Sequence, residues 1–278
     1  MEKVNALKNI LLKSTYIDAD LFEKVAALEI EYDKRFQELY KHRRDIISDK
    51  IKPTVDESRW EYPSNIARTD ACDLSNFWCE VFRNSNIETL QDKDYEILKF
   101  CTDVNYEYLP LVKRPGFVLT LTFSKDNPYF KNEKLTKTYY QSFTVETENG
   151  MNPLDYEGPY ISGIEGCKIE WLEGKNVTKK TIKKTIKNKS SGEKKCIMKQ
   201  VEDESFFNFF NTQKVEITVD NEEEYQEDID IGQSIKEDII PKAILYYTQE
   251  IDDSYDEETD EDENEESYET DDDEEHEE

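Results

Sequence analysis

The sequence predicts an α+β protein with a long N-terminal helix, a domain in which helices precede several antiparallel strands, and a disordered acidic C-terminal tail. Three observations predict this class. Residues 14–52 contain neither proline nor glycine. The hydrophobic spacing changes from the helical period to strict alternation at residue 116. The last residues have too few apolar side chains to offset the entropy of ordering the chain. The predicted segments are 1–13, the long helix 14–52, the domain 53–248 and the tail 249–278.

The long helix has one apolar face. Its members recur at spacings of mostly three and four: Leu21, Val25, Leu28, Tyr32, Phe36, Leu39 and Ile46. Asp18 and Asp20 are candidate N-caps, and Pro53 marks the end. At 1.5 Å per residue the helix spans on the order of 50 Å. One small domain does not cover a helix of that length, so we expect it to pair with a second copy in a homodimer. The alternative is a core helix within a single chain.

The domain begins with helices over residues 73–104. The segment GFVLTLTF (116–123) then alternates apolar and polar side chains, as a half-buried strand does. Further strands are expected at 134–145, 167–171 and 177–187. The turn at 188–192 returns the chain through a strand at 195–201, and a helix follows at 231–247. Helices and strands are thus segregated along the chain, as in α+β domains.

The net charge restricts the class of partner. The 278 residues include 36 basic and 65 acidic side chains, for a formal charge of −29. Residues 250–278 hold 20 of the acids and no lysine or arginine, which leaves −29 + 20 = −9 for the rest. Such a chain repels DNA and acidic lipids and attracts polycations. No stretch approaches the ~20 apolar residues of a membrane helix.

Two acidic segments are candidate binding sites for a polycation. The first lies inside the domain and comprises Glu222, Glu223, Glu224, Glu227, Asp228 and Asp230. The second lies in the tail and comprises Asp252, Asp253, Tyr255, Asp256, Glu257 and Glu258, where the tyrosine ring can stack on an arginine. The alternative is an acidic tract that only adds solubility. Ser254, Thr259 and Thr270 each precede an acid by three residues, so they are candidate phosphorylation sites.

A lysine-rich hairpin is the basic counterpart. Its candidate nuclear-import residues are Lys179, Lys180, Lys183, Lys184 and Lys187. Such a run indicates an import signal or a nucleic-acid patch, whereas the alternative is the solvent face of an exposed hairpin. Because the surrounding domain is net acidic, we favour contact with an importin, or transient contact with chromatin, over stable sequence-specific DNA binding.

The sequence lacks the patterns of a catalytic site. The two histidines, His42 and His276, have no plausible nucleophile or metal partner nearby in sequence, and the eight glycines form neither GxGxxG nor a Walker loop. The five cysteines are scattered and include no CxxC pair, which argues against a zinc site and a disulfide framework. We therefore expect a non-enzyme without a cofactor or metal.

Several motifs, in their order along the chain, resemble the nucleosome assembly protein family. They are FWCEVFRN (77–84), DYEILKF (94–100), GFVLTLTF (116–123), NPYFKNEKLTKTY (127–139), WLEGKNVTKKTIKK (171–184), SFFNFF (205–210) and DIGQSIKEDIIPKAILYYT (230–248). The upstream segment FEKVAALEIEYDKRFQELYKHRRDII resembles the family's dimerisation helix. One departure is Gln249, which stands where the family usually has glycine.

The resemblance implies a fold and a function. The long helices would pair antiparallel, and each protomer would add a four-stranded antiparallel sheet with underlying helices. An acidic concave surface, together with the tail, would hold core histones, shield them from nonspecific contact with DNA and deliver them in nucleosome assembly or disassembly. The family shuttles between nucleus and cytoplasm, which suits the lysine-rich hairpin.

Two other functions fit the same composition. One is a general acidic escort or adaptor for basic proteins, such as ribosomal proteins or linker histones. The other is a regulatory inhibitor of an enzyme such as a phosphatase. Selectivity for histones over polylysine of equal charge separates the escort from the chaperone.

Overall fold

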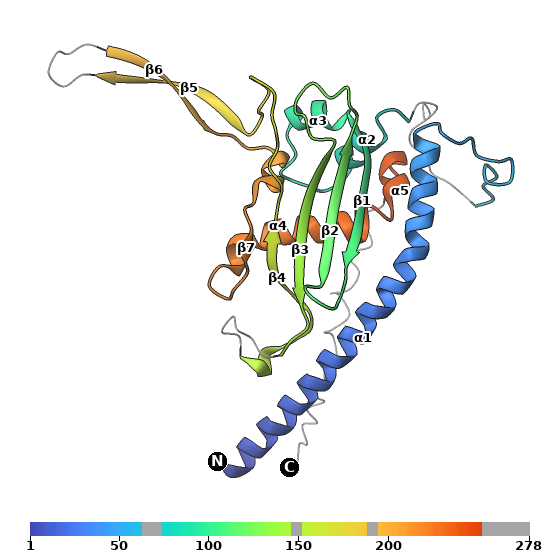
Figure 1. Cartoon of the computed structure of the whole chain (residues 1–278), viewed down its shortest axis with the longest axis vertical. Helices are drawn as coiled ribbons and strands as arrows, with labels where there is room; N and C mark the ends of the chain where they lie inside the picture. Colours follow the sequence, from blue (N-terminus) through green and yellow to red (C-terminus); the bar gives the residue numbers. More distant parts are fainter. Residues whose placement is uncertain (63–73, 146–151, 188–193, 252–278) are drawn as a thin grey trace, which may run out of the picture.

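The computed structural model describes residues 1–62, 74–145, 152–187 and 194–251. A long helix lies along one side of an α+β domain, and a two-stranded ribbon projects from the other side (Figure 1). The helices are α1 (Glu2–Ile47), α2 (Phe77–Arg83), α3 (Asp92–Leu98), α4 (Glu222–Ser234) and α5 (Ala243–Thr248). Short helical turns are η1 (Pro153–Asp155), η2 (Phe206–Asn211) and the π-helical η3 (Ile235–Ile239). The strands are β1 (Cys101–Leu109), β2 (Gly116–Phe123), β3 (Lys134–Ser142), β4 (Tyr160–Glu165), β5 (Lys179–Lys187), β6 (Lys194–Glu202) and β7 (Val215–Glu216).

The main sheet is antiparallel and has the order β1-β2-β3-β4-β7. Its four long strands confirm the predicted α+β class, and β7 adds only two residues at the edge. Alternate residues of β2 are buried, because one face of the sheet packs on the helices: Phe117, Leu119, Leu121 and Phe123. Strands β5 and β6 form a separate two-stranded ribbon, in agreement with the predicted hairpin.

The predicted helical stretch 73–104 is wrong beyond Leu98. Residues from Cys101 onward form β1, an edge strand that pairs with β2, for example Tyr106 opposite Leu119. Cys101 and Val104 are both buried and three residues apart, which also fits a helix. The hydrogen bonds to β2 decide the conformation, and such non-local pairing is absent from the local pattern.

The predicted strand at 167–171 is also wrong. The strand beside β3 is β4, and the 167–171 segment contributes only an isolated bridge between Trp171 and Phe130. Strand β4 contains Gly163, which gives a weak strand signal. A Cβ there would lie 3.0 Å from the main-chain carbonyl oxygen of Val215 on the neighbouring strand β7, and 2.9 Å from Nη2 of Arg114, so the close approach of the backbones favours glycine.

Helix boundaries differ from the prediction at both ends of α1 and at the start of α4. Helix α1 ends at Ile47 and not at residue 52, and its N-cap is Met1 and not Asp18 or Asp20. Helix α1 begins at Glu2, so residues 2–13 continue the helix and are not a separate segment. The helix expected at 231–247 begins at Glu222 and passes through a π-helical turn into α5. Its first turn contains three glutamates, whose charge favours a helix N-terminus. The prediction missed this turn because it relied on apolar spacing, which the glutamates do not provide.

A buried ion pair fixes α4 on the sheet. Lys137 of β3 is fully buried, and its Nζ lies 2.5 Å from Oδ2 of Asp228 on α4. The ammonium also donates to the carbonyl of Phe209 and the hydroxyl of Thr212, while the Tyr139 hydroxyl donates to Asp228 at 2.8 Å. Burial lowers the pKa of Lys137. The carboxylate therefore neutralises a charge that the core could not otherwise tolerate.

We expect Asp228→Asn to destabilise the fold by roughly 3–5 kcal/mol, because it leaves the Lys137 ammonium buried without a counter-charge. The urea midpoint of unfolding measures the loss. Glu227→Gln, an exposed neighbour on the same helix, is the control and should change the midpoint little. Equal midpoints for the two variants would contradict this role of Asp228.

The end of α5 contains a strained backbone position. Gln249 has a φ of 59°, in the left-handed region where glycine costs least. We expect Gln249→Gly to raise the free energy of unfolding by about 0.5–1 kcal/mol, measured by urea denaturation. Gln249→Ala removes the same side chain without relieving the strain and should bring no gain; a gain from alanine alone would argue against the strain.

Candidate functional site

Helix α1 has two apolar faces, of which the inner one packs on its own domain. The inner residues recur at spacings of three and four: Thr15, Ala19, Phe22, Ala26, Ile30, Asp33, Gln37, Tyr40, Arg44 and Ile47. The Gln37 amide donates to the carbonyl of Tyr106 at 2.9 Å, and Arg44 pairs with Asp103 at 2.9 Å. Arg43 donates to the carbonyl of Ile240 and lies 5.2 Å above the ring of Trp78. These contacts bind the C-terminal half of the helix to the sheet and to η3.

The outer face of α1 contains the predicted dimerisation residues. Leu21, Val25, Leu28, Tyr32, Phe36 and Leu39 are between 42% and 63% exposed, whereas Ile46 is half-buried. Val4, Leu7, Ile10, Leu11 and Ile17 extend the exposed apolar set toward the N-terminus. At 3.6 residues per turn the two faces are about a third of a turn apart. The single chain therefore covers one apolar face of α1 and leaves the other in solvent, as an unused interaction surface does.

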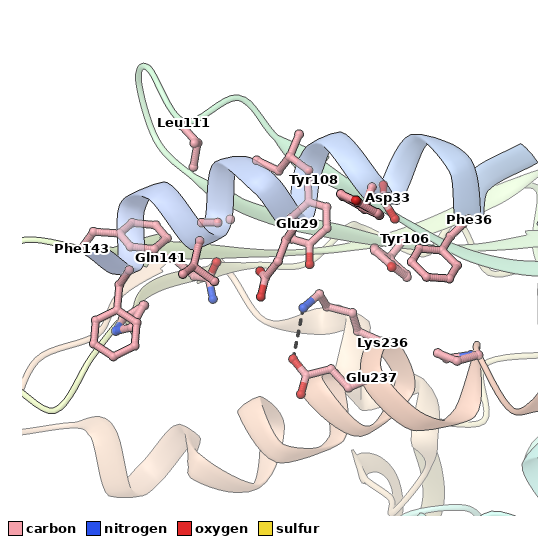
Figure 2. Close-up of a pocket in the computed structure, with 18 of the residues that line it drawn as sticks. Glu29, Asp33, Phe36, Tyr106, Tyr108, Leu111, Gln141, Phe143, Lys236 and Glu237 are labelled. Carbon is pink, nitrogen blue, oxygen red and sulfur yellow. Dashed lines mark hydrogen bonds and ion pairs between the residues drawn. The ribbon is translucent and has the colours of Figure 1, made fainter. Parts of the chain in front are cut away.

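A groove of about 550 Å³ lies between α1 and the domain. Figure 2 shows Glu29, Asp33 and Phe36 of α1 across from Lys236 and Glu237 of η3. Nζ of Lys236 lies 3.1 Å from Oε1 of Glu237 and 5.1 Å from the ring centroids of Tyr108 and Phe117. The groove is continuous with the outer face of α1, because Phe36 and two other outer-face residues also line it.

Helix α4 presents a rigid acidic face. Glu222, Glu223, Glu224, Glu227 and Asp230 are all exposed. Within the described part of the chain, no lysine or arginine forms an ion pair with any of them. Asp228 differs, since its carboxylate faces inward to Lys137. Five of the six predicted acids of this cluster therefore offer free negative charge, and the sixth orients the helix.

A cavity of about 590 Å³ opens beside the acidic face. Its lining combines carboxylates from three segments with aromatic rings: Glu88, Glu204, Glu224, Glu227, Tyr225 and Phe209. A concave site with negative charge and ring faces suits a lysine or arginine side chain, which is attracted to both. Glu88 and Glu204 were missed in the sequence because they are distant from α4 along the chain, and only folding brings them beside it.

The β5–β6 ribbon holds the predicted basic residues. Lys179, Lys180 and Lys183 are exposed, and Lys184 and Lys187 occupy register positions on the same strand. At the base of the ribbon, Lys180 and Lys93 pair with Asp203 at 2.6 and 2.5 Å, and these ammonium groups lower the pKa of the Asp203 carboxyl to about 2.

Some predicted residues lie outside the described part of the chain. They are Asp252, Asp253, Ser254, Tyr255, Asp256, Glu257, Glu258, Thr259 and Thr270. Among the described residues no group of three or more histidine, cysteine or acidic side chains could hold a metal ion. His42 contacts Glu57 at 2.8 Å on the surface. No helix in the described ranges is both long and apolar enough to cross a membrane.

Known proteins share both the sequence pattern and the fold. The family model described as nucleosome assembly protein (NAP) matches residues 2–250. Nucleosome assembly protein 1-like 1 of Xenopus tropicalis is 35% identical over 285 residues, which cover 92% of this chain and 72% of the relative. Human nucleosome assembly protein 1-like 4 is 35% identical over 287 residues, covering 92% and 76%.

The solved structures agree in fold. Nucleosome assembly protein 1 from Plasmodium knowlesi superposes with a TM-score of 0.56 at 24% identity, covering 90% of this chain and 96% of that one. Its helix and sheet arrangement matches the one described above. With the family model and the curated relatives agreeing over most of its length, the chain belongs to the nucleosome assembly protein family, whose members are non-enzymatic histone chaperones.

Proposed function

We propose that the protein is a homodimeric chaperone that holds core histones on the acidic face of α4 and in the acidic tail. The observation that carries the proposal is the set of five exposed acids on α4, none of which has an ion-pair partner among the described residues, beside an acid-lined cavity. Held there, a histone would have part of its positive charge masked and would not collapse onto DNA nonspecifically. Because charge contacts are reversible and screened by salt, the histone can still be passed on in nucleosome assembly or taken back in disassembly.

The dimer is proposed from the outer face of α1. Burying this face against an antiparallel copy removes large apolar side chains from water, which favours association. The helix has 46 residues and spans about 70 Å, so two copies have room for a long interface. A second copy also explains why the helix keeps an apolar face that its own domain does not cover.

The double substitution Leu21→Glu and Leu28→Glu should convert the dimer to a monomer in sedimentation equilibrium, because it places two charges in each copy of the buried interface. Ala27→Glu is the matched control. It adds the same kind of charge at an exposed position away from both apolar faces and should leave the dimer intact. A wild-type protein that sediments as a monomer would contradict the proposed pairing.

Histone binding should depend on α4. We expect Glu223→Gln, Glu224→Gln and Glu227→Gln together to weaken binding of refolded core histone pairs roughly tenfold at physiological salt, measured by fluorescence titration. The matched control neutralises three exposed acids elsewhere: Glu107, Glu133 and Glu173. If both triple variants lose the same affinity, net charge and not the α4 face determines binding. Urea midpoints of the two variants confirm that both remain folded.

A general acidic escort would bind any polycation of equal charge. If the protein is a chaperone, we expect unlabelled polylysine of matched charge to compete poorly with histones. The cavity and the fixed spacing of the acids make the affinity depend on the shape of the ligand as well as on its charge. Equal competition by polylysine would favour the escort.

The proposal has three further parts. The ribbon lysines would contact an importin, the protein would contact chromatin transiently, and Ser254, Thr259 or Thr270 would be phosphorylated. These parts fit a chaperone that shuttles between cytoplasm and nucleus.

A further inference from the structure

The β5–β6 ribbon is a strongly basic surface on an acidic protein. Residues 179–202 contain nine lysines and two glutamates, a charge of −2 + 9 = +7. The ribbon projects from the domain (Figure 1), and both of its faces are open where side chains are described. Lys179 and Lys183 share one face, whereas Lys180 and Lys199 are on the other. Where its side chains are described, the ribbon thus presents positive charge to solvent on both faces.

The ribbon has too little negative charge of its own. Its register places Lys187 directly opposite Lys194, and like charges in that position destabilise a strand pair. An isolated two-stranded ribbon is marginally stable even without such repulsion. At its base, the pairing of Asp203 with Lys180 and Lys93 neutralises charge only at that end. An anionic partner along the ribbon would therefore stabilise it.

We propose that this partner is the C-terminal segment of the same chain, residues 252–278, which folds back onto the ribbon and must be displaced when a basic ligand takes the tail. The segment contains 19 acidic residues and no lysine or arginine, so its charge complements that of the ribbon. The contact itself requires no histone and stands apart from the proposed function. Only the competition with a basic ligand rests on it.

The path from the last described residue to the ribbon is short enough. Ile251 packs against the core, and Tyr247 of α5 stacks on Phe77 of α2 at 4.9 Å. Helix α2 contacts α3, and Lys93 of α3 reaches the ribbon base at Asp203. Two helix–helix contacts, each with about 8–10 Å between the axes, thus separate α5 from α3 and the ribbon base. A coil of 27 residues has a root-mean-square span of about 30 Å, which matches this distance.

Tethering makes a weak charge contact effective. A flexible connection of this length holds the tail near the ribbon at an effective concentration in the millimolar range. A basic ligand then competes with the ribbon for the same carboxylates, and its apparent affinity falls by the fraction of tails that are captured. The ribbon would in this way keep the tail from binding weak or nonspecific cations, while a ligand with many positive charges would still displace it.

Zero-length carbodiimide cross-linking of the full-length protein tests the contact without any ligand. We expect amide links between the ribbon lysines and carboxylates in 252–278, which disappear at high salt because screening removes the attraction. Unfolding and refolding an equal mixture of light and heavy isotope-labelled protein exchanges the subunits of the proposed dimer and distinguishes the source, and links within one label should predominate. Absence of ribbon–tail links, or light–heavy links as frequent as same-label links, would overturn the proposal.

Affinity for fluorescent polylysine tests the competition. Replacing Lys179, Lys183, Lys187 and Lys199 by glutamine should raise the affinity about fivefold more than replacing Lys125, Lys131, Lys134 and Lys168, which changes net charge equally. Lys180 is left in place because it holds Asp203. Equal gains in the two variants would refute the competition. If the wild-type protein gives the ribbon–tail cross-links but does not bind histones, the proposed function is refuted and the contact remains supported.

Discussion

The ion pair between Lys137 and Asp228 determines how the acidic face is presented. A fully buried ammonium in the middle of β3 requires a carboxylate, and α4 supplies one from its inward side. Because successive helical residues point 100° apart, fixing Asp228 inward turns Glu223, Glu227 and Asp230 toward solvent. The same contact holds η2 through the Phe209 carbonyl, while Asp94 accepts from Ser205 and Phe206 beside Glu204, which lines the cavity. The free acids are therefore held in a fixed arrangement, which a disordered tract alone could not provide.

Helix α1 meets a second constraint, since it must satisfy two partners with different chemistry. Its inner face mixes small, apolar and polar residues, and Gln37, Arg43 and Arg44 anchor it by hydrogen bonds to main-chain and carboxylate oxygens. Such directional contacts set the orientation of the helix on the domain. The outer face contains mainly large aliphatic and aromatic side chains, which suit a less directional contact with another apolar surface. In the proposed dimer the two copies meet at the outer face of α1. The inner face would then determine the direction in which the acidic surface of each protomer points relative to this interface.

The sequence predicted the α+β class, the long helix and the ribbon because each has a local signal: a run without proline or glycine, period-two alternation, or a turn between lysine-rich strands. It failed where tertiary pairing decides, as for Cys101–Leu109, whose buried positions fit either period. It failed again at β4, where Gly163 fits beside the main-chain oxygen of Val215 but weakens the strand signal. In the acidic cluster it could not separate Asp228 from its neighbours, since nothing local shows which carboxylate meets a buried lysine. Glu88 and Glu204 join the site only through folding.

Charge is distributed along this chain in three physical forms: a rigid acidic face, a basic ribbon and an acidic terminal segment. A rigid face selects ligands by the spacing of its charges, whereas a polyanionic coil binds any polycation with little selectivity. If the coil were always free, it would dominate capture and the selectivity of the face would be lost. In the proposed contact, the basic ribbon would correct this, because only ligands with enough positive charge to displace the ribbon would reach the terminal segment. The lysines therefore need not oppose the acidic function. In the proposed contact they would raise the positive charge that a ligand needs before it binds the terminal segment.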